Sequence, residues 1–140
     1  MKRANEVLVK VKRGNLKAEW VRERAERILD ILGVEGVELS VLITDDEEMR
    51  YLNHLYRGKD RPTDVLSFPM GDEVGGRVIL GDVVVSADMA KERTEVERLL
   101  IHGIIHLLGY DHERGDEEEE LFRSMENKVL GELSRCVWKT

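Results

Sequence analysis

Three of the four histidines of this chain lie within the segment HGIIHLLGYDH, residues 102–112. His102 and His106 are four residues apart, so in an α-helix they project from the same face, one turn apart, close enough to share a metal ion. Gly109 allows a left-handed residue at the end of that helix, and the chain can then turn back toward it. The spacing therefore predicts one metal ion bound by His102, His106 and His112.

The number of imidazoles and the residues between them indicate what such a metal would do. Three imidazoles leave the fourth position of a tetrahedral zinc ion open, as in catalytic zinc sites. The spacing HxxxHxxGxxH equals the metzincin signature HExxHxxGxxH at every position but one. At that position a zincin has the glutamate that takes a proton from the zinc-bound water, and this chain has Gly103. A peptidase is therefore disfavoured.

Gly103 needs an explanation of its own, because a glycine inside a helix costs about 1 kcal/mol relative to alanine. It would let the helix pack closely against a sheet, or it would leave room for a substrate. The residue Asp111, beside His112, also has two interpretations: it orients a ligand imidazole or it stays on the surface.

A second segment, residues 52–70, could face the metal. It places Arg57, Lys59 and Arg61 in a loop ahead of a predicted strand, where cationic side chains can meet phosphate. Arg57 could offer a bidentate grip. The alternative is a solvated loop in which Arg57 only forms an ion pair, for example with Asp60 or Asp64. The fourth histidine, in the helix before this loop, is His54, and its apolar neighbours predict that it is not a metal ligand.

Hydrophobic periodicity predicts the elements that must position these side chains. Strands are expected at residues 6–13, 37–44, 65–68 and 77–86. Helices are expected at residues 16–32, from 45 to about 56, at 95–108 and at 116–134. Capping pairs are expected at three helix starts, formed by Thr44 with Glu47, Thr94 with Glu97 and Asp116 with Glu119.

The order of these elements predicts the fold class. The last two strands should form a hairpin around the turn GDEVGG, and helices should cover one mixed sheet. The chain is therefore expected to be a single α+β domain over residues 1–140, with a mixed four-stranded sheet packed with about four to five helices.

Composition limits the class of partner and the compartment. The net charge of −7 argues against nucleic acid when taken over the whole chain, but residues 1–27 hold nine Lys and Arg against four Glu, so a basic face remains possible. The single cysteine, Cys136, cannot form an internal disulfide, which fits a reducing compartment. No apolar run approaches the roughly 20 residues that span a bilayer. We expect a cytoplasmic protein without a membrane partner.

The segments HGIIHLLGYDH, YRGKDRPTDVLSFP and LGDVVVS together resemble the YbeY family, bacterial metal-dependent endoribonucleases of ribosomal RNA maturation. The match runs from about residue 40 to residue 113. The resemblance implies one Zn²⁺ per chain held by His102, His106 and His112, Arg57 as a catalytic residue in the cleft, and single-stranded ribosomal RNA as substrate. It also implies 3′-end maturation of 16S rRNA, ribosome quality control, and components of the small ribosomal subunit as partners.

Elementary zinc chemistry is compatible with this activity. A three-histidine zinc ion lowers the pKa of its bound water to about 7, so hydroxide is available without a neighbouring glutamate. Two alternatives remain: a ribosome-assembly factor in which the metal only braces the histidine loop, and a metallohydrolase for another substrate. The metallohydrolase, for example one that acts on a peptide, is the least favoured of these functions because Gly103 replaces the glutamate.

Overall fold

The computed structural model describes residues 3–135, so Cys136 lies outside the described residues. The strands are β1 (Glu6–Val11), β2 (Val37–Thr44), β3 (Val65–Pro69), β4 (Glu73–Val74) and β5 (Arg77–Ser86). The helices are α1 (Ala18–Ile31), α2 (Asp46–Arg57), α3 (Arg93–Leu107) and α4 (Asp116–Leu133). Within the described chain, no helix has both the length and the apolar character needed to cross a membrane.

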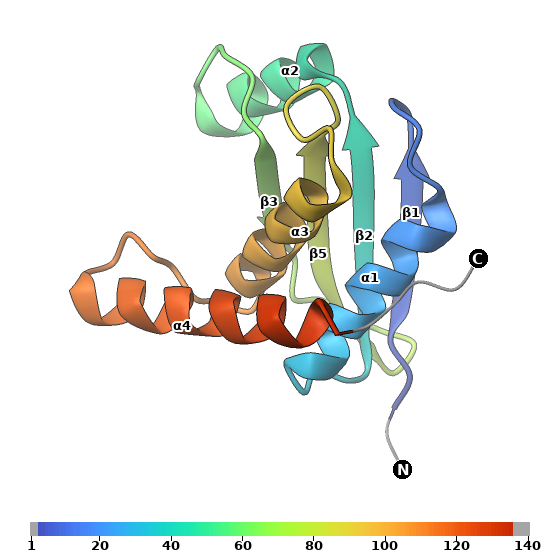
Figure 1. The fold of residues 1–140 in the computed structure, drawn as a ribbon, viewed down its shortest axis with the longest axis vertical. Helices are drawn as coiled ribbons and strands as arrows, with labels where there is room; N and C mark the ends of the chain where they lie inside the picture. The colour runs from blue at the N-terminus through green and yellow to red at the C-terminus, as the bar shows by residue number, and fades with distance from the viewer. Residues whose placement is uncertain (1–2, 136–140) are drawn as a thin grey trace.

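The strands form one mixed sheet in the order β1-β2-β5-β3 (Figure 1). β1 and β5 both run parallel to β2, and β3 runs antiparallel to β5, which confirms the predicted hairpin. The segment predicted as a plain turn contains the two-residue strand β4, which pairs with the start of β5. The sheet therefore has five strands where four were expected, and the α+β class is confirmed.

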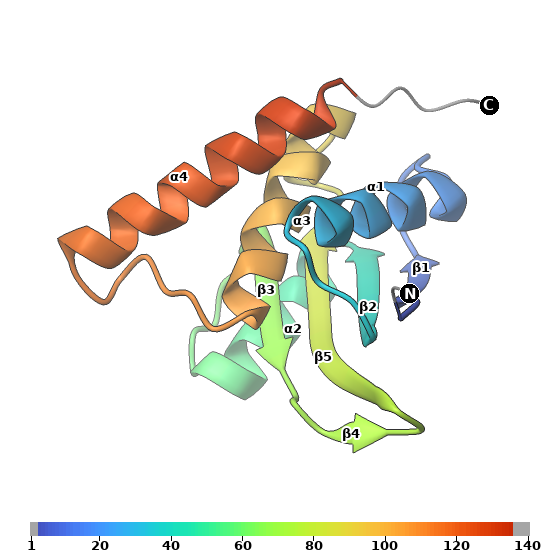
Figure 2. The same ribbon diagram turned by 90° about the horizontal axis from the view of Figure 1, so that it is seen from below.

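The two faces of the sheet are covered unequally. Figure 2 shows α1, α3 and α4 on one side of the sheet and α2 on the other. The main core lies on the three-helix side and includes fully buried Ile28, Ile43, Ile101 and Phe122. A smaller cluster lies under α2, around Met49. Because side chains alternate between faces along a strand, each central strand contributes to both clusters.

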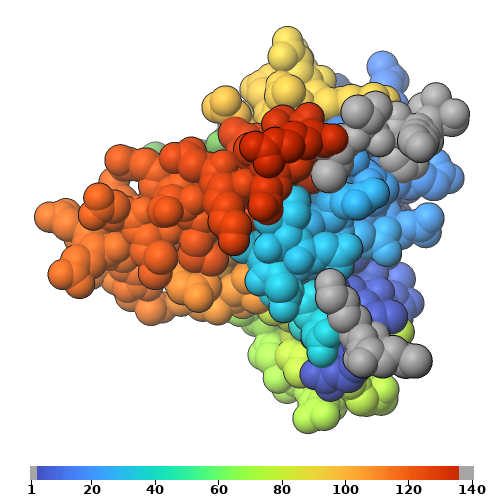
Figure 3. Space-filling model, turned by 60° about the horizontal axis from the view of Figure 1, so that its bottom comes forward, coloured from blue at the N-terminus to red at the C-terminus, as the bar shows by residue number. Residues whose placement is uncertain are grey.

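Helix α4 extends past the edge of the sheet. Figure 3 shows the loop before α4 and the start of this helix, in orange, projecting from the body of the molecule. The first turn of α4 is acidic, with Asp116, Glu117, Glu118 and Glu119. Carboxylates at a helix N-terminus are stabilised by the helix dipole, so this charge is well placed in solvent.

The helix starts differ from the predicted capping pairs. The cap of α2 is Asp45, whose carboxylate accepts the main-chain N–H of Glu48 at 2.9 Å, one residue after the predicted position. Helices α3 and α4 have no side-chain cap at Glu92 and Gly115. Glu97 lies instead 3.5 Å from the guanidinium of Arg24, a buried residue of α1. A tertiary ion pair thus replaces the local cap predicted for α3.

Candidate metal centre and cleft

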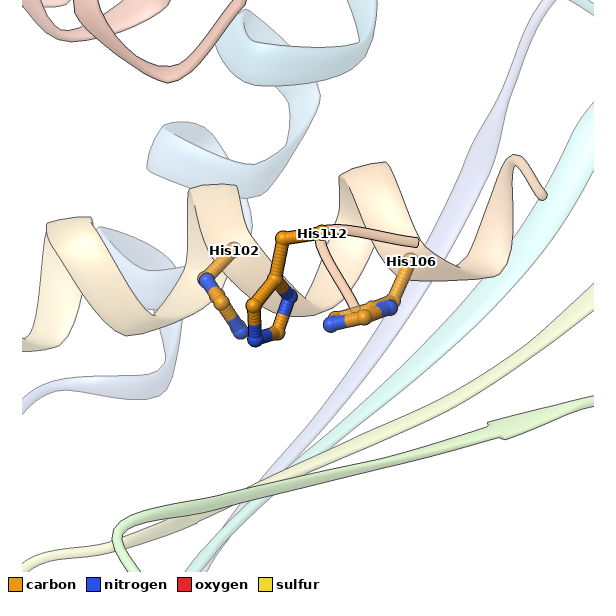
Figure 4. Close-up of side chains that lie close together, drawn as sticks. All are labelled: His102, His106 and His112. Carbon is orange, nitrogen blue, oxygen red and sulfur yellow. The ribbon is translucent and has the colours of Figure 1, made fainter. Parts of the chain in front are cut away.

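The structure brings the three histidines of residues 102–112 together (Figure 4). His102 and His106 lie one turn apart on α3, and Gly109, with a φ of +100°, reverses the chain so that His112 returns to them. One ring nitrogen from each residue lies within 4.8 Å of the others, and the cluster could hold a metal ion. Figure 4 shows a nitrogen of each ring turned toward the other two.

An aromatic ring from α4 supports this cluster. The ring of Phe122 lies 4.9–5.2 Å, between centroids, from each of the three imidazoles. Phe122 is 1% exposed and belongs to the main core. The imidazoles are therefore packed on one side against a fixed apolar surface, which restricts their rotation.

The environment of His106 favours its neutral form. Burial lowers the pKa of His106 below its ordinary value of 6.5, and the rings of His102 and His112 lower it further. Metals bind the neutral imidazole, because the ligating nitrogen must be free of a proton. The donor set therefore suits a divalent transition metal such as zinc.

A carboxylate on α4 orients one of the imidazoles. The Nδ1 of His102 lies 3.0 Å from Oε2 of Glu126. An ionised carboxylate only accepts hydrogen bonds, so Nδ1–H donates to it and the other nitrogen is left without a proton. Carboxylates beside metal-binding histidines act in this way. Glu126 was not identified from the sequence, because it lies 24 residues from His102 on another helix.

Asp111 has a different role in the structure. Its carboxylate accepts the main-chain N–H of Glu113 at 2.9 Å, and this bond lowers the pKa of Asp111. Its Oδ2 lies 3.8 Å from Nε of Arg114. The Asp111 side chain thus stabilises the turn after the histidine helix. The carboxylates that meet imidazoles come from Glu126, 3.0 Å from His102, and from Glu113, 3.9 Å from His112.

Gly103 is explained by close packing. A Cβ atom at this position would lie 2.8 Å from Cγ1 of Val83 and 3.1 Å from Oγ of Ser67. The hydroxyl of Ser67 also donates to the carbonyl oxygen of Gly103 at 3.2 Å. The space beside Gly103 is therefore filled by the sheet, and of the two interpretations the structure supports helix packing over room for substrate.

The histidines line a cleft of about 530 Å³ that also includes Arg57, Thr63 and Asp64. Strand β3 forms one wall, and the loop that carries His112 forms another. Lys59 and Arg61 are not among the residues that line this cleft, whereas Arg114, which the sequence did not single out, is. His54 lies on α2 and belongs neither to the cleft nor to the histidine cluster.

The guanidinium of Arg57 is available for a ligand. Within residues 3–135, Arg57 forms no ion pair and no side-chain hydrogen bond. Of the two acids that could have paired with it, Asp60 binds Arg50 at 2.7 Å and 3.1 Å, and the carboxylate of Asp64 accepts the hydroxyl of Thr63 at 3.5 Å. The cleft thus combines three converging imidazoles with an unpaired arginine, a combination suited to an anionic substrate.

Comparisons with known proteins agree with this arrangement. A family model described as Endoribonuclease YbeY matches residues 5–134. Endoribonuclease YbeY of Aquifex aeolicus (strain VF5) is 54% identical, with 95% of each chain covered, and that of Persephonella marina is 42% identical, with 97% of each chain covered. The solution structure of TM1509 from Thermotoga maritima has a TM-score of 0.57 and 30% identity, with 92% of each chain covered. The chain belongs to the YbeY family of endoribonucleases.

Proposed function

We propose that this protein is a zinc-dependent endoribonuclease that cleaves single-stranded RNA with one Zn²⁺ held by His102, His106 and His112. The observation that carries the proposal is the convergence of the three imidazoles in a cleft shared with the unpaired Arg57. Zinc is the metal proposed because a site of three imidazoles with an open fourth position suits it.

Different residues have different roles in the proposed cleavage reaction. Zinc, when bound, supplies a Lewis acid and lowers the pKa of a coordinated water. Burial keeps His106 neutral, and Glu126 fixes the ring of His102. Arg57 binds the phosphate at the scissile bond and neutralises the charge that develops on its oxygens. The planar guanidinium suits two phosphate oxygens at once.

We further propose that the substrate is 16S ribosomal RNA, cleaved during 3′-end maturation and ribosome quality control in the cytoplasm. Membership of the YbeY family supports this proposal, and components of the small ribosomal subunit are the partners it implies. Residues 1–140 would act as one endoribonuclease domain, because the family model spans almost all of them.

The decisive experiment compares cleavage of single-stranded and duplex RNA by zinc-loaded protein. We expect cleavage of the single strand, loss of activity with a chelator, and loss of both zinc and activity in His106→Ala. His54→Ala serves as the histidine control and should keep its zinc. Equal cleavage by the wild type and by His106→Ala would assign the activity to a contaminating nuclease.

The proposed role of Arg57 is tested by measuring the kcat of variants at this position. Arg57→Ala should keep the fold and the zinc while lowering kcat about 100-fold, the usual effect of removing one group that stabilises a developing oxyanion. Arg57→Lys should recover only part of the rate, because it keeps the charge and loses the two-pronged geometry. A wild-type kcat for Arg57→Ala would exclude a catalytic role.

A second candidate function is a ribosome-assembly factor with a structural metal. The packing of Phe122 against all three imidazoles favours it, because a metal there would fix the histidine loop to α3 beside a core residue of α4. On this alternative the zinc-loaded protein binds ribosomal RNA without cleaving it. Product formation in the experiment above separates the two functions.

A further inference from the structure

The turn that follows α2 is bonded at both ends to a single residue of that helix, Asn53. The Nδ2 of Asn53 donates to the main-chain carbonyl of Arg61 at 2.9 Å. The main-chain carbonyl of Asn53 accepts the N–H of Lys59 at 3.3 Å. Asn53 is 2% exposed, although asparagine is usually found at the surface. The turn of residues 59–61 is therefore clamped onto α2 from a buried position.

An exposed ion pair holds the middle of the same turn. Arg50, one helical turn before Asn53, binds both carboxylate oxygens of Asp60. The side chains of Arg50 and Asp60 are 58% and 57% exposed, so water weakens their attraction and the pair stabilises the turn little. The bond from Asn53 matters more, because Asn53 is buried and water competes less for its side chain.

The clamped turn connects two parts of the cleft wall. Arg57 precedes it and Thr63 and Asp64 follow it, and all three line the cleft with the histidines. At the far end, the N–H of Ser86 donates to the carbonyl of Asp64 at 2.9 Å and fixes the loop to β5. Between Arg57 and Asp64, the contacts of Asn53 hold the main chain of the loop in place.

Arg57 depends on this backbone for its placement. In the described part of the chain its side chain has no ion pair or hydrogen bond that would hold it. It is the last residue of α2 and is followed by Gly58, whose φ is +69°. The direction in which Arg57 points is thus set by the end of the helix and by the turn bonded to it.

We propose that Asn53 is a positioning residue for RNA cleavage: by holding residues 59–61 it fixes the place of Arg57 in the cleft. The inference rests on the catalytic role proposed for Arg57. The Oδ1 of Asn53 has no hydrogen-bond partner within residues 3–135, so the Nδ2 bond to Arg61 is the contact through which its side chain acts. A displacement of about 1 Å in such a group can lower a rate by about 100-fold.

The test is a double-mutant cycle on kcat with zinc-loaded protein and single-stranded RNA, using wild type, Asn53→Ala, Arg57→Ala and the double variant. We expect Asn53→Ala to lower kcat at least about tenfold with unchanged zinc content. In the Arg57→Ala background the same substitution should change kcat by less than about twofold, because no guanidinium is left to position.

Asn5→Ala is the matched control. Asn5 also clamps a loop with its side chain, donating to the carbonyl of Val34 at 2.8 Å and accepting from the N–H of Val37 at 3.0 Å. It lies beside β1, at the opposite edge of the sheet from β3. Asn5→Ala should lower the melting temperature and leave kcat unchanged.

Limited trypsin digestion gives a readout independent of activity. Loss of the Asn53 bond should let the turn open. Trypsin should then cleave the peptide bonds after Arg57 and Lys59 about tenfold faster in Asn53→Ala than in Asn5→Ala, because proteolysis needs local opening. If Asn53→Ala does not fold, Asn53→Ser, which keeps a small polar group, takes its place in the cycle with the same expectations.

Three results would overturn the inference. A wild-type kcat for Asn53→Ala, together with a low kcat for Arg57→Ala, would exclude a positioning role for Asn53 and leave the proposed role of Arg57 intact. Equal fold-losses from Asn53→Ala in both backgrounds show that Asn53 acts independently of Arg57. A wild-type kcat for Arg57→Ala removes the role of Arg57 and, with it, that of Asn53.

Discussion

At the scale of single residues, the contact between Glu126 and His102 links α4 to the proposed zinc site. We expect Glu126→Gln to weaken zinc binding about tenfold to 100-fold, because a neutral amide orients the imidazole less well and makes it a poorer donor. Competition with a chromogenic chelator measures the zinc affinity. Glu120→Gln, an exposed position on the same helix, is the control and should bind zinc as the wild type does.

A zinc affinity of Glu126→Gln equal to that of the control would show that the 3.0 Å contact has no influence on the metal. Because the two variants remove the same charge from α4, any difference between them reports the contact itself. The kcat of the zinc-saturated Glu126→Gln protein then shows whether the carboxylate also matters once the metal is in place.

His106 gives a prediction about pH for the metal-free protein. Its pKa in the folded state is lowered by burial, below the 6.5 of an unfolded chain, so as pH falls the unfolded state takes up the proton first. The stability that neutral His106 contributes is present above pH 6.5 and is lost as pH falls through the lower, folded-state value. Chemical unfolding from pH 8 to 5 should show this loss in the wild type and a flatter curve in His106→Gln. Parallel curves would contradict it.

At the scale of elements, the approach of α3 to the sheet is set by Gly103. Gly103→Ala should destabilise the protein by about 1–2 kcal/mol, because crowding against Val83 and Ser67 costs about 1–3 kcal/mol and the gain in helix propensity returns at most about 1 kcal/mol. Urea unfolding measures the change.

Gly131 in α4 provides the opposite case. Among residues 3–135, nothing lies within 4 Å of a Cβ atom placed there, so Gly131→Ala should stabilise the protein by up to about 1 kcal/mol. Two glycine-to-alanine changes in helices should thus have opposite signs. If Gly103→Ala were also stabilising, α3 would be free to move away from β5, and close packing would not explain the glycine.

Local patterns in the sequence predict local structure well. The predicted strands at 37–44 and 77–86 have the observed bounds of β2 and β5, and the helical spacing of His102 and His106 brings their rings together because it depends only on helix geometry. Thr94 and Glu97 fail as a cap because Glu97 meets Arg24, 73 residues away in the chain. A pattern of adjacent residues contains no information about such distant partners.

The parts of the site that sequence reasoning missed share this cause. Glu126 reaches His102 from a separate helix, and Asn53 holds its loop through the main-chain carbonyl of Arg61. Every residue has a main-chain carbonyl, so the residue type of Arg61 does not reveal that it accepts this bond. The proposed ligands are predictable from spacing, whereas identifying the residues that orient them requires the folded chain.

At the scale of the whole molecule, two hollows of similar size lie on opposite faces of the sheet. The one behind the sheet, about 540 Å³, is lined mostly by apolar side chains such as Leu42 and Tyr56 around the carboxyl of Asp82, whose pKa is raised by burial. The other, about 530 Å³, contains the three imidazoles and Arg57. Convergent imidazole nitrogens and the unpaired guanidinium of Arg57 favour the second hollow as the proposed reaction site.

The distribution of charge suggests how RNA reaches the cleft. The acidic first turn of α4 projects from one side of the molecule, and its carboxylates repel phosphate (Figure 3). Arg57 lies on the other side of the cleft, at the end of α2. We therefore expect the strand to enter past the end of α2 and along β3, away from the start of α4.

The main core is independent of the metal, and this determines how the protein should respond to chelation. A cluster of buried apolar side chains fills the space between the sheet and α1, α3 and α4, whereas the three histidines are only partly buried. A domain of 140 residues buries enough surface to fold without a metal. Removing zinc should therefore leave the far-UV circular dichroism spectrum nearly unchanged and the thermal transition cooperative.

The melting temperature should nevertheless fall, because the proposed zinc ion would bind the folded state and stabilise it by about 2.7 kcal/mol when its free concentration is 100 times the dissociation constant. The measurement is a pair of thermal melts with and without a chelator, for the wild type and for His106→Ala. The wild type should lose stability on chelation, and His106→Ala, which lacks a ligand, should show little change. Collapse of the helical signal on chelation at 25 °C would instead mean that the metal is needed to maintain the fold, which would favour a structural metal.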